Sequence, residues 1–519
     1  MKRKFLLSIL TILAISICNE ATIAQTPAVD NSNTIKVAAG AQYKRSPFYR
    51  FFWGTNYRNE WTTPVSLPQL YLDTLRGGLL SYKVGGSNQT KSLHLTTMGE
   101  KEYTLRSVDK TLNKVIPDVF EGTFVADIVN DAISMSNPYG ALAVPGMAKA
   151  IKINHTMPQY FYLPEQKALD TLNKKFAGKM YLFEQRPKGD WTEADNLGNF
   201  KKFKDLEDML EDIKENHNNM IDQPAFVRAR LLDMLIGDFD RHGDQWKWGI
   251  RKEGDKRIYV PVPTDRDQAF STRSGLLLTL VIKIAGLKYI QPYDEKIHDV
   301  EGLAQINRLL DRLVTNKMTL AEWQAIATDV KSLLTDEAIE NSVKGMPPEI
   351  FAIRGEKLIS NLKNRRDHLL EYVTDYYGLL AEEVEVVGTK EDEYFEINNL
   401  ADNMTEIKMY HLNENRKGDS EPFYSRVFNK NETDEIRLYG ISGNDVFQVN
   451  GSLNKKIIVR IIGGNMRDSI VDLSPPSHKT QVHVYDNKDN FFKTTAATQL
   501  HLSEKSAVHT YNYNSFKQD

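Results

Sequence analysis

Alternation of apolar and polar positions marks the first regular part of the chain, between residues 79 and 108. Three runs, at 79–84, 91–97 and 102–108, alternate as strands do, and a glycine turn at 85–88 separates the first two. This pattern predicts an antiparallel meander. Residues 120–134 then carry apolar side chains at helical spacing, which predicts one amphipathic helix, and 180–185 reads as a short strand.

The spacing of apolar residues becomes helical after residue 205. Helices are expected at 206–217, 222–236, 304–334 and 348–376, and Asp222 and Pro224 suit the start of the second. The apolar run 275–287 is expected to form a core helix. From about residue 385, short alternating runs separated by Gly and Asn predict an all-β region. The expected fold class is therefore α+β, with a β-rich region, a helical region and a small all-β domain.

The first 24 residues have the pattern of a secretory signal peptide. Three basic residues precede the apolar run 5–17, and the small residue Ala24 suits the position before cleavage. The run is too short to span a bilayer comfortably, and no later stretch is apolar enough to do so. A lipoprotein anchor at Cys18 is less favoured, because Ile17 stands where a small residue is required. We therefore expect a periplasmic or envelope-associated protein.

These patterns divide the chain into five segments. We expect a signal peptide at 1–24, an extension at 25–78 that packs on the β-rich region, the β-rich region at 79–185, the helical region at 186–384 and the all-β domain at 385–519. A length of 519 residues agrees with several domains, since one domain typically has about 100–200 residues.

Charge and cysteine content restrict the chemistry. The 66 basic and 69 acidic residues nearly cancel, so no overall positive field favours nucleic acid as a partner. Cys18 is the only cysteine and lies in the expected signal peptide, which excludes disulfides and thiol catalysis from the mature chain. Cysteine-bound zinc is excluded there for the same reason.

Two acidic segments carry the densest candidate chemistry. Residues 237–245, directly after an expected helix, include Asp240, His242 and Gln245, and residues 263–270, after a short strand, include Asp265 and Asp267. Loops at the ends of helices and strands can converge in space. Carboxylates and an amide are oxygen donors that suit a hard octahedral cation, such as Mg²⁺ or Mn²⁺, bridging substrate phosphates.

The spacing within these segments resembles that of the atypical protein kinase-like superfamily, in particular HipA-type kinases, CotH spore-coat kinases and secretory-pathway casein kinases. Those families have an Asp, then His two residues on and an amide five residues on; Asp240, His242 and Gln245 match. Their metal segment has an Asp followed five residues later by Phe, as Asp265 and Phe270 stand here. The resemblance implies that Asp240 accepts or orients the proton of the attacking hydroxyl and that Gln245 and Asp265 hold metal ions.

The resemblance covers roughly residues 79–270 and implies a two-lobed protein kinase-like fold, with a β-rich N-lobe and a helical C-lobe. Asp267 stands where the CotH-like version has a second acid, so it is a further candidate metal ligand. In a purely structural alternative, Asp240 and Asp265 cap helices or pair with Arg241 and Arg266. That alternative is less favoured, because it does not predict both spacings at once.

The same resemblance implies nucleotide-binding residues in the β-rich region. Glycines at the turn let backbone N–H groups approach phosphates, and a Gln-x-Lys follows them, as in HipA-type kinases. Arg106 stands where the families have a lysine paired with a helical glutamate, and arginine does not simply replace lysine, so Lys110 or Lys91 could take that role. Residues 182–186 would link the lobes. The candidate cofactor-binding residues are Gly85, Gly86, Gln89, Lys91, Arg106, Glu121 and Glu184.

The all-β region contains two imperfect copies of a glycine–aspartate calcium-roll motif, at 440–447 and 463–470. A calcium roll requires stacked neighbours, so β turns with left-handed glycines are favoured and calcium is a minor hypothesis. The whole arrangement also resembles exported proteins of Bacteroidetes-type bacteria in which a kinase-like region precedes an outer-membrane β-barrel. The chain stops where such a barrel would begin. Two interpretations follow: a naturally short member of this group of proteins, or the product of a truncated gene. An outer-membrane protein is a candidate partner.

The leading hypothesis is an exported, Mg²⁺- or Mn²⁺-dependent phosphotransferase. It would move a phosphoryl group from ATP or another nucleotide to a hydroxyl of a protein, glycan or small molecule. A non-catalytic envelope scaffold or pseudokinase is the second hypothesis. A metallohydrolase that uses Asp238, Asp240, Asp265 and His242 is the third. A scaffold should tolerate Asn at positions 240 and 265, whereas a phosphotransferase should not.

Overall fold

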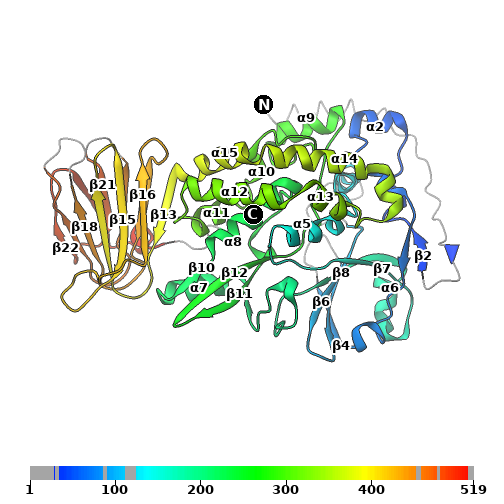
Figure 1. Cartoon of the computed structure of the whole chain (residues 1–519), viewed down its shortest axis with the longest axis horizontal. Helices are drawn as coiled ribbons and strands as arrows, with labels where there is room; N and C mark the ends of the chain where they lie inside the picture. The colour runs from blue at the N-terminus through cyan, green and yellow to red at the C-terminus, as the bar shows by residue number, and fades with distance from the viewer. Residues whose placement is uncertain are drawn as a thin grey trace.

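The computed structural model describes residues 28–29, 34–85, 91–110, 124–451, 457–475 and 480–511. A β-rich lobe, a helical lobe and an all-β domain follow one another along the chain; in Figure 1 the β-rich lobe is at the lower right, the helical lobe lies above it and toward the centre, and the all-β domain is at the left. The predicted fold class is confirmed: the chain is α+β, with a β-rich lobe and a helical lobe followed by a β domain. Among the described residues, no helix combines the length and apolar character needed to cross a membrane.

The β-rich lobe is built on a five-stranded antiparallel sheet in the order β4-β5-β6-β8-β7. Leu93, Leu95 and Leu105 are fully buried between this sheet and the elements that cover it, so the predicted meander is confirmed. Its strands are β4 (Leu79–Gly85), β5 (Ser92–Thr97), β6 (Glu102–Ser107), β7 (Gln159–Leu163) and β8 (Lys179–Gln185). The helices of the lobe are α4 (Phe124–Asp131), α5 (Val144–Ala150) and α6 (Asn173–Phe176). Residues 120–123 of the expected helix lie outside the described residues.

The helical lobe is organised around α8 (Gln223–Ile236), which is buried along most of its length. The Asp222 carboxylate accepts a hydrogen bond from Ala225 N at 3.1 Å and Gly237 ends the helix with a φ of 66°, so the predicted start and end are confirmed. The helices around α8 are α7 (Leu206–Glu215), α9 (Leu276–Ala285), α10 (Val300–Leu303), α11 (Arg308–Val314), α12 (Leu320–Leu333), α13 (Asp336–Val343), α14 (Pro348–Asp367) and α15 (Leu369–Ala381).

Two long helices expected in this lobe are each divided. The stretch 304–334 contains α11 and α12, because Thr319 and Glu322 form a capping box that starts a new helix. The stretch 348–376 contains α14 and α15, which meet at His368. The four-stranded sheet of this lobe runs β10-β12-β11-β9 and consists of β9 (Phe203–Lys204), β10 (Asn219–Ile221), β11 (Trp246–Glu253) and β12 (Lys256–Pro263).

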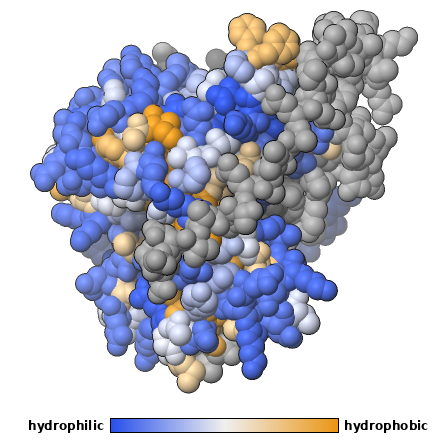
Figure 2. All heavy atoms as spheres, turned by 90° about the vertical axis from the view of Figure 1, so that its right-hand side faces the viewer, coloured by the Kyte–Doolittle hydropathy of each residue, from blue (hydrophilic) through white to orange (hydrophobic). Residues whose placement is uncertain are grey.

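The prediction of a core helix at 275–287 is wrong. A helix does form there as α9, but only Leu278 and Ile282 are buried, whereas Leu276 and Ile284 are more than half exposed. The sequence is apolar apart from Thr279 and Lys283, a pattern typical of a buried helix, but α9 packs at the surface against α2 (Pro47–Trp53), as Figure 1 shows. The face of the molecule in Figure 2 is otherwise mostly hydrophilic, with scattered apolar patches.

The all-β domain is a solenoid of two sheets: β14, β15 and β16 first form an antiparallel meander in one sheet, and from β17 the chain alternates between the two sheets with parallel pairing. One sheet is β13 (Glu383–Val387), β17 (Glu435–Tyr439), β19 (Ile458–Ile462), β21 (Val482–Asp486) and β23 (Thr498–Leu502). The other runs β16 (Tyr424–Asn429), β15 (Met404–His411), β14 (Glu393–Asn399), β18 (Val446–Asn450), β20 (Ser469–Asp472) and β22 (Phe491–Lys493). Within each sheet, paired positions of neighbouring strands carry apolar side chains that fill the space between the two sheets. Phe395 stacks on Phe447 in this way, and Leu438 lies beside Ile461.

The two glycine–aspartate motifs are corners of successive coils of this solenoid. Asp445 N donates to Asp468 Oδ1 at 2.9 Å, and Glu393 N donates to Asp445 Oδ1 at 2.8 Å, so equivalent positions form a ladder. Two copies of the motif did not predict these stacked neighbours, whereas Gly443 and Gly464 have φ of 115° and 103°, which agrees with the expected turns with glycines at positive φ. Gly463 is needed because a Cβ there would lie 2.1 Å from Asp486 Oδ2.

The segment before the β-rich lobe contacts both lobes. Its β3 (Val65–Pro68) pairs with β2 (Thr34–Val37), and Leu70 N donates to Tyr162 O on the β-rich lobe at 2.8 Å. Its α3 (Arg58–Thr62) reaches the helical lobe, where Arg354 Nε lies 2.7 Å from Glu60 Oε1. A short strand, β1 (Ala28–Val29), adds to β2.

Candidate functional site

The hairpin formed by β11 and β12 brings the two acidic loops together. Gln245 directly precedes β11 and Thr264 directly follows β12, and Thr264 N donates to Gln245 O at 2.9 Å. Their neighbours Trp246 and Pro263 face each other in the register of the two strands. Two segments about twenty residues apart in sequence are thus adjacent, as the sequence argument expected.

A buried ionic network holds both loops against α8. The Asp233 carboxylate lies 3.2 Å from Arg241 Nε, 3.1 Å from Arg266 Nη2 and 3.0 Å from Arg230 Nη1. Burial alone would raise the pKa of Asp233, but these guanidinium groups outweigh it and lower the pKa. Because Arg241 belongs to the first loop and Arg266 to the second, one carboxylate fixes both. Sequence analysis did not single out Asp233.

Three buried oxygens of this pair of loops have no hydrogen-bond partner among the described residues: Asp238 Oδ1, Gln245 Oε1 and Asp265 Oδ1. Asp265 has a φ of 57°, a left-handed conformation that costs a non-glycine residue about 1–3 kcal/mol and is frequent at functional sites. Unpartnered buried oxygens are costly unless a ligand satisfies them. An amide and a carboxylate oxygen fit Mg²⁺ or Mn²⁺ chemically, so these residues suit the expected metal.

Two cations reach these carboxylates from the β-rich lobe and the segment after it. Arg106 on β6 donates to Glu184 on β8 at 2.6 Å and lies 3.2 Å from Asp265 Oδ1, without the alignment of a hydrogen bond. Lys110 Nζ lies 2.5 Å from Asp267 Oδ2. Burial would lower the pKa of Lys110, but Asp267 more than offsets it and the pKa is raised. Both cations are thus charged and placed where phosphate oxygens could replace carboxylates.

Asp240 stands beside this cluster in an environment that favours its neutral form. Burial and then the charge of Asp267 raise the pKa of Asp240 to about 7. No ion pair joins Asp240 to Arg241 in the described structure, since Arg241 is bound to Asp233 and to Asp238. The structural alternative in which Asp240 pairs with Arg241 therefore has no support. A carboxylate with a pKa near neutrality can accept a proton from a reacting hydroxyl.

Two further candidates, His242 and Lys91, make hydrogen bonds through their backbones. His242 is half-buried, and its carbonyl accepts a hydrogen bond from Gln245 N at 3.1 Å, which closes the first loop. Lys91 is exposed, and its backbone exchanges hydrogen bonds with Ser107.

Glu184 and Gly85 have defined structural contacts. The Glu184 carboxylate is buried and accepts from Arg106 and from the Thr156 hydroxyl, and burial raises its pKa. Gly85 ends β4, where a Cβ would lie 2.3 Å from His94 Nε2. Three further candidates, Gly86, Gln89 and Glu121, lie outside the described residues.

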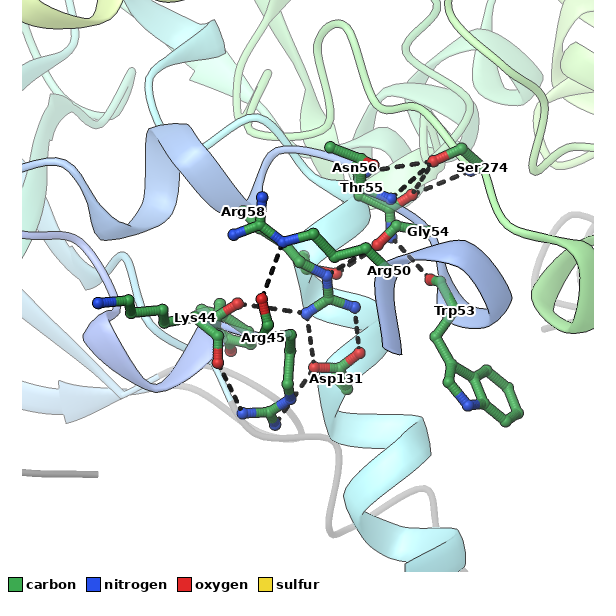
Figure 3. Close-up of polar contacts among 12 residues, drawn as sticks. Lys44, Arg45, Arg50, Trp53, Gly54, Thr55, Asn56, Arg58, Asp131 and Ser274 are labelled. Carbon is green, nitrogen blue, oxygen red and sulfur yellow. Dashed lines mark hydrogen bonds and ion pairs between the residues drawn. The ribbon is translucent and has the colours of Figure 1, made fainter. Parts of the chain in front are cut away.

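The N-terminal segment supports the second loop from behind, which the sequence did not indicate. The Tyr57 hydroxyl donates to Phe270 O at 2.5 Å, and Asn56 Oδ1 accepts from Ser274 N at 3.0 Å. Figure 3 shows the neighbouring contacts, in which Arg58 donates to Asp131 at the end of α4, at 2.8 Å. The segment therefore ties α4 and the end of the second loop to one another.

Comparison with known proteins gives distant structural likenesses. No known protein family and no curated protein matches the chain. The proinflammatory kinase CtkA of Helicobacter pylori is similar at 9% identity and a TM-score of 0.32, over 59% of this chain and 99% of that one. A Golgi casein kinase is similar at 10% identity and a TM-score of 0.29, over 66% and 84%. HipA of Shewanella oneidensis MR-1 is similar at 10% and 0.29, over 57% and 67%.

Proposed function

We propose that this chain is a metal-dependent phosphotransferase that moves a phosphoryl group from a nucleotide to a hydroxyl acceptor. One observation carries the proposal: the buried oxygens Gln245 Oε1 and Asp265 Oδ1 accept no hydrogen bond within the described residues and lie in two loops fixed by Asp233. In the structure the cation beside Asp265 Oδ1 is Arg106, and a bound metal ion would satisfy both oxygens. Phosphoryl transfer depends on positioning and on charge neutralisation, and both are available here.

Each residue of the site would have a distinct task. Gln245 and Asp265 would hold the cation, with Asp267 as a further ligand once Lys110 turns to a phosphate. A bound Mg²⁺ or Mn²⁺ would neutralise charge on the transferred phosphoryl group. Asp240, whose pKa is raised to about 7 by burial and then by Asp267, would accept the proton of the acceptor hydroxyl.

Arg106 and Lys110 would bind the phosphates of the nucleotide. Arg106 offers a planar fork of donors, so it can hold Glu184 and a phosphate oxygen at once. In the structure Arg106 instead lies against Asp265. Nucleotide and cation binding would thus exchange an internal ion pair for two ligand contacts, and we expect the two ligands to bind with positive coupling.

The proposal also covers the acceptor of the phosphoryl group and the cellular location of the enzyme. The signal-peptide pattern of residues 1–24, which lie outside the described residues, supports export of the enzyme to the periplasm or cell envelope. A hydroxyl of a protein, glycan or small molecule there would be the acceptor, and an outer-membrane protein is the candidate partner.

Thermal unfolding of the purified protein tests the proposal. The parent should be stabilised by ATP with Mn²⁺ more than by either alone, since a ligand at about 100 times its dissociation constant adds about 2.7 kcal/mol. Asp265→Asn should lose this shift, whereas Asp244→Asn, an exposed carboxylate in the neighbouring loop, should keep it. Transfer of the terminal phosphate should disappear in Asp240→Asn while the binding shift remains.

The absence of any shift with ATP, GTP or UTP and either metal would refute the phosphotransferase. A non-catalytic scaffold would then be favoured, and the ion pair of Arg106 with Asp265 is the observation on its side, because it occupies the proposed metal oxygen. A scaffold predicts that Asp240→Asn and Asp265→Asn have no effect on ligand binding.

A further inference from the structure

A second cluster of metal-ligating side chains lies away from the proposed phosphotransferase site. His217 follows α7 in the helical lobe, Glu391 precedes β14 in the solenoid, and His411 ends β15. One ligand atom from each lies within 4.8 Å of the other two, the one such group of three among the described residues. The rings of His217 and His411 meet edge to face, with centroids 4.2 Å apart. Residues 194 positions apart in the chain are thus neighbours.

The contacts of His217 leave one of its nitrogens free for a ligand. Nε2 lies 2.8 Å from Glu393 Oε1, a carboxylate that is fully buried. Nδ1 is buried, lies close to Glu391 Oε2, and has no aligned hydrogen bond among the described residues. Metal-bound histidines typically give the second ring N–H to a carboxylate, which fixes the tautomer. His217 has this arrangement, with Nδ1 facing the other two residues.

The other two residues are held in place by the backbone and by neighbouring side chains. Glu391 Oε1 accepts from Asn216 Nδ2 at 3.1 Å and Oε2 accepts from His217 N at 3.2 Å, which leaves lone pairs on the carboxylate. His411 lies opposite Glu393 in the register of β14 and β15. The Phe423 ring packs at 4.3 Å from that of His217 and 5.5 Å from that of His411.

We propose that His217, Glu391 and His411 bind a transition-metal ion of the zinc class, which fastens the helical lobe to the solenoid. Two imidazole nitrogens and one carboxylate oxygen form a donor set of zinc, not of Mg²⁺ or Ca²⁺, which prefer oxygen alone. The Glu391 side chain is 40% exposed, so the ion has access from solvent and water can complete its coordination. This site is separate from the phosphotransferase site and does not depend on the function proposed for it.

Zinc binding to the full chain tests this site. The chelator-treated protein is dialysed against Zn²⁺ in the presence of excess Mg²⁺, and the bound zinc and the unfolding temperature are measured. We expect one zinc per chain and a higher unfolding temperature. His411→Phe keeps the ring packing and removes the nitrogens, so it should weaken zinc binding by at least about tenfold.

Matched variants separate this site from others. His483 and His501 are a second pair of neighbouring histidines, but among the described residues no carboxylate joins them in a group of three possible metal ligands. The His483→Phe variant should therefore bind zinc like the parent. Asp265→Asn should also keep the zinc while losing the Mn²⁺–nucleotide response. If His411→Phe is misfolded without metal, Glu391→Gln gives the same test with an isosteric change.

Two results would overturn the proposal. One is parental zinc binding by His411→Phe or by Glu391→Gln. The other is a parent that takes up no zinc under these conditions, in which case the two His217 nitrogens have Glu391 and Glu393 as their acidic partners.

Discussion

Arg106 Nη1 lies 3.2 Å from Asp265 Oδ1, so an ion pair joins the β-rich lobe to the loop that follows β12. The same nitrogen donates to Glu184 at 2.6 Å, and Asp265 Oδ1 has no aligned hydrogen bond. The contact is therefore electrostatic and loosely directed. A cation could replace the guanidinium at this oxygen, while the hydrogen bond to Glu184 keeps Arg106 in the site.

Removing the charge of Arg106 should have opposite effects on metal and nucleotide. In Arg106→Met, Mn²⁺ alone should bind about tenfold more tightly, the scale of one nearby charge on an ionised group, because Asp265 loses its competing cation. The additional stabilisation by ATP should be lost, because the phosphates lose a donor. Titration of Mn²⁺, with and without ATP, measures both effects.

Arg186→Met is the matched control for this experiment. Arg186 pairs with Glu102 at 2.6 Å at the end of β8, away from the acidic loops. The Arg186→Met substitution should leave the affinities for Mn²⁺ and for ATP unchanged. Weaker Mn²⁺ binding in Arg106→Met would contradict the competition between Arg106 and the cation.

Asp233 should be the most sensitive single position for the stability of the helical lobe. Asp233→Asn leaves three buried arginines without their shared carboxylate, and breaking such a buried network costs about 3–5 kcal/mol in the free energy of unfolding. Asp336→Asn removes an exposed ion-paired carboxylate and should destabilise the protein far less, because exposed ion pairs contribute little to stability. Urea unfolding of both variants makes the comparison, and equal losses would refute the role of Asp233.

Tyr57 should affect the metal through the backbone it holds. Tyr57→Phe leaves the buried carbonyl of Phe270 without its donor, which should cost about 1–3 kcal/mol and loosen the second loop. Mn²⁺ should therefore stabilise the variant less than the parent. Tyr71→Phe, which removes an exposed hydroxyl bonded to Gln69, should change neither quantity. A Tyr57→Phe protein with parental stability and metal response would exclude this coupling.

The sequence predicted those features of the fold that depend on interactions between residues close together in the chain. The alternation at 79–108 and the Asp222 cap each act within a few residues, so the meander and α8 are found where expected. The spacing of Asp240 and Gln245 also located the first loop, since the helix before it and the strand after it are local.

The pattern of apolar and polar residues did not predict contacts between residues that are far apart in the chain. Asp233 joins two loops through buried charge, and a single aspartate within an apolar helix gives no indication of its partners. His217 and His411 meet only because the helical lobe packs against the solenoid. The exposure of α9 was missed because only Thr279 and Lys283 interrupt its apolar sequence, and exposed apolar residues such as Leu276 and Ile284 carry no local signal of the surface.

The aspartate ladder of the solenoid should make the protein less stable as pH rises. Burial and then the charge of Asp486 raise the pKa of Asp468 to about 8, against about 3.9 in the unfolded chain. The folded state thus prefers neutral Asp468, and its contribution to stability is complete below about pH 4 and is lost as the pH approaches 8.

The variant Asp468→Asn keeps an oxygen that accepts from Asp445 N, and it cannot ionise. As the pH rises, its free energy of unfolding should therefore fall less steeply than that of the parent, with slopes that differ by up to about 1.4 kcal/mol per pH unit. Unfolding temperatures between pH 5 and 9 measure the slope. Asp489→Asn, an exposed carboxylate at the next corner, should follow the parent, and an unchanged slope in Asp468→Asn would show that Asp468 is already ionised in the folded protein.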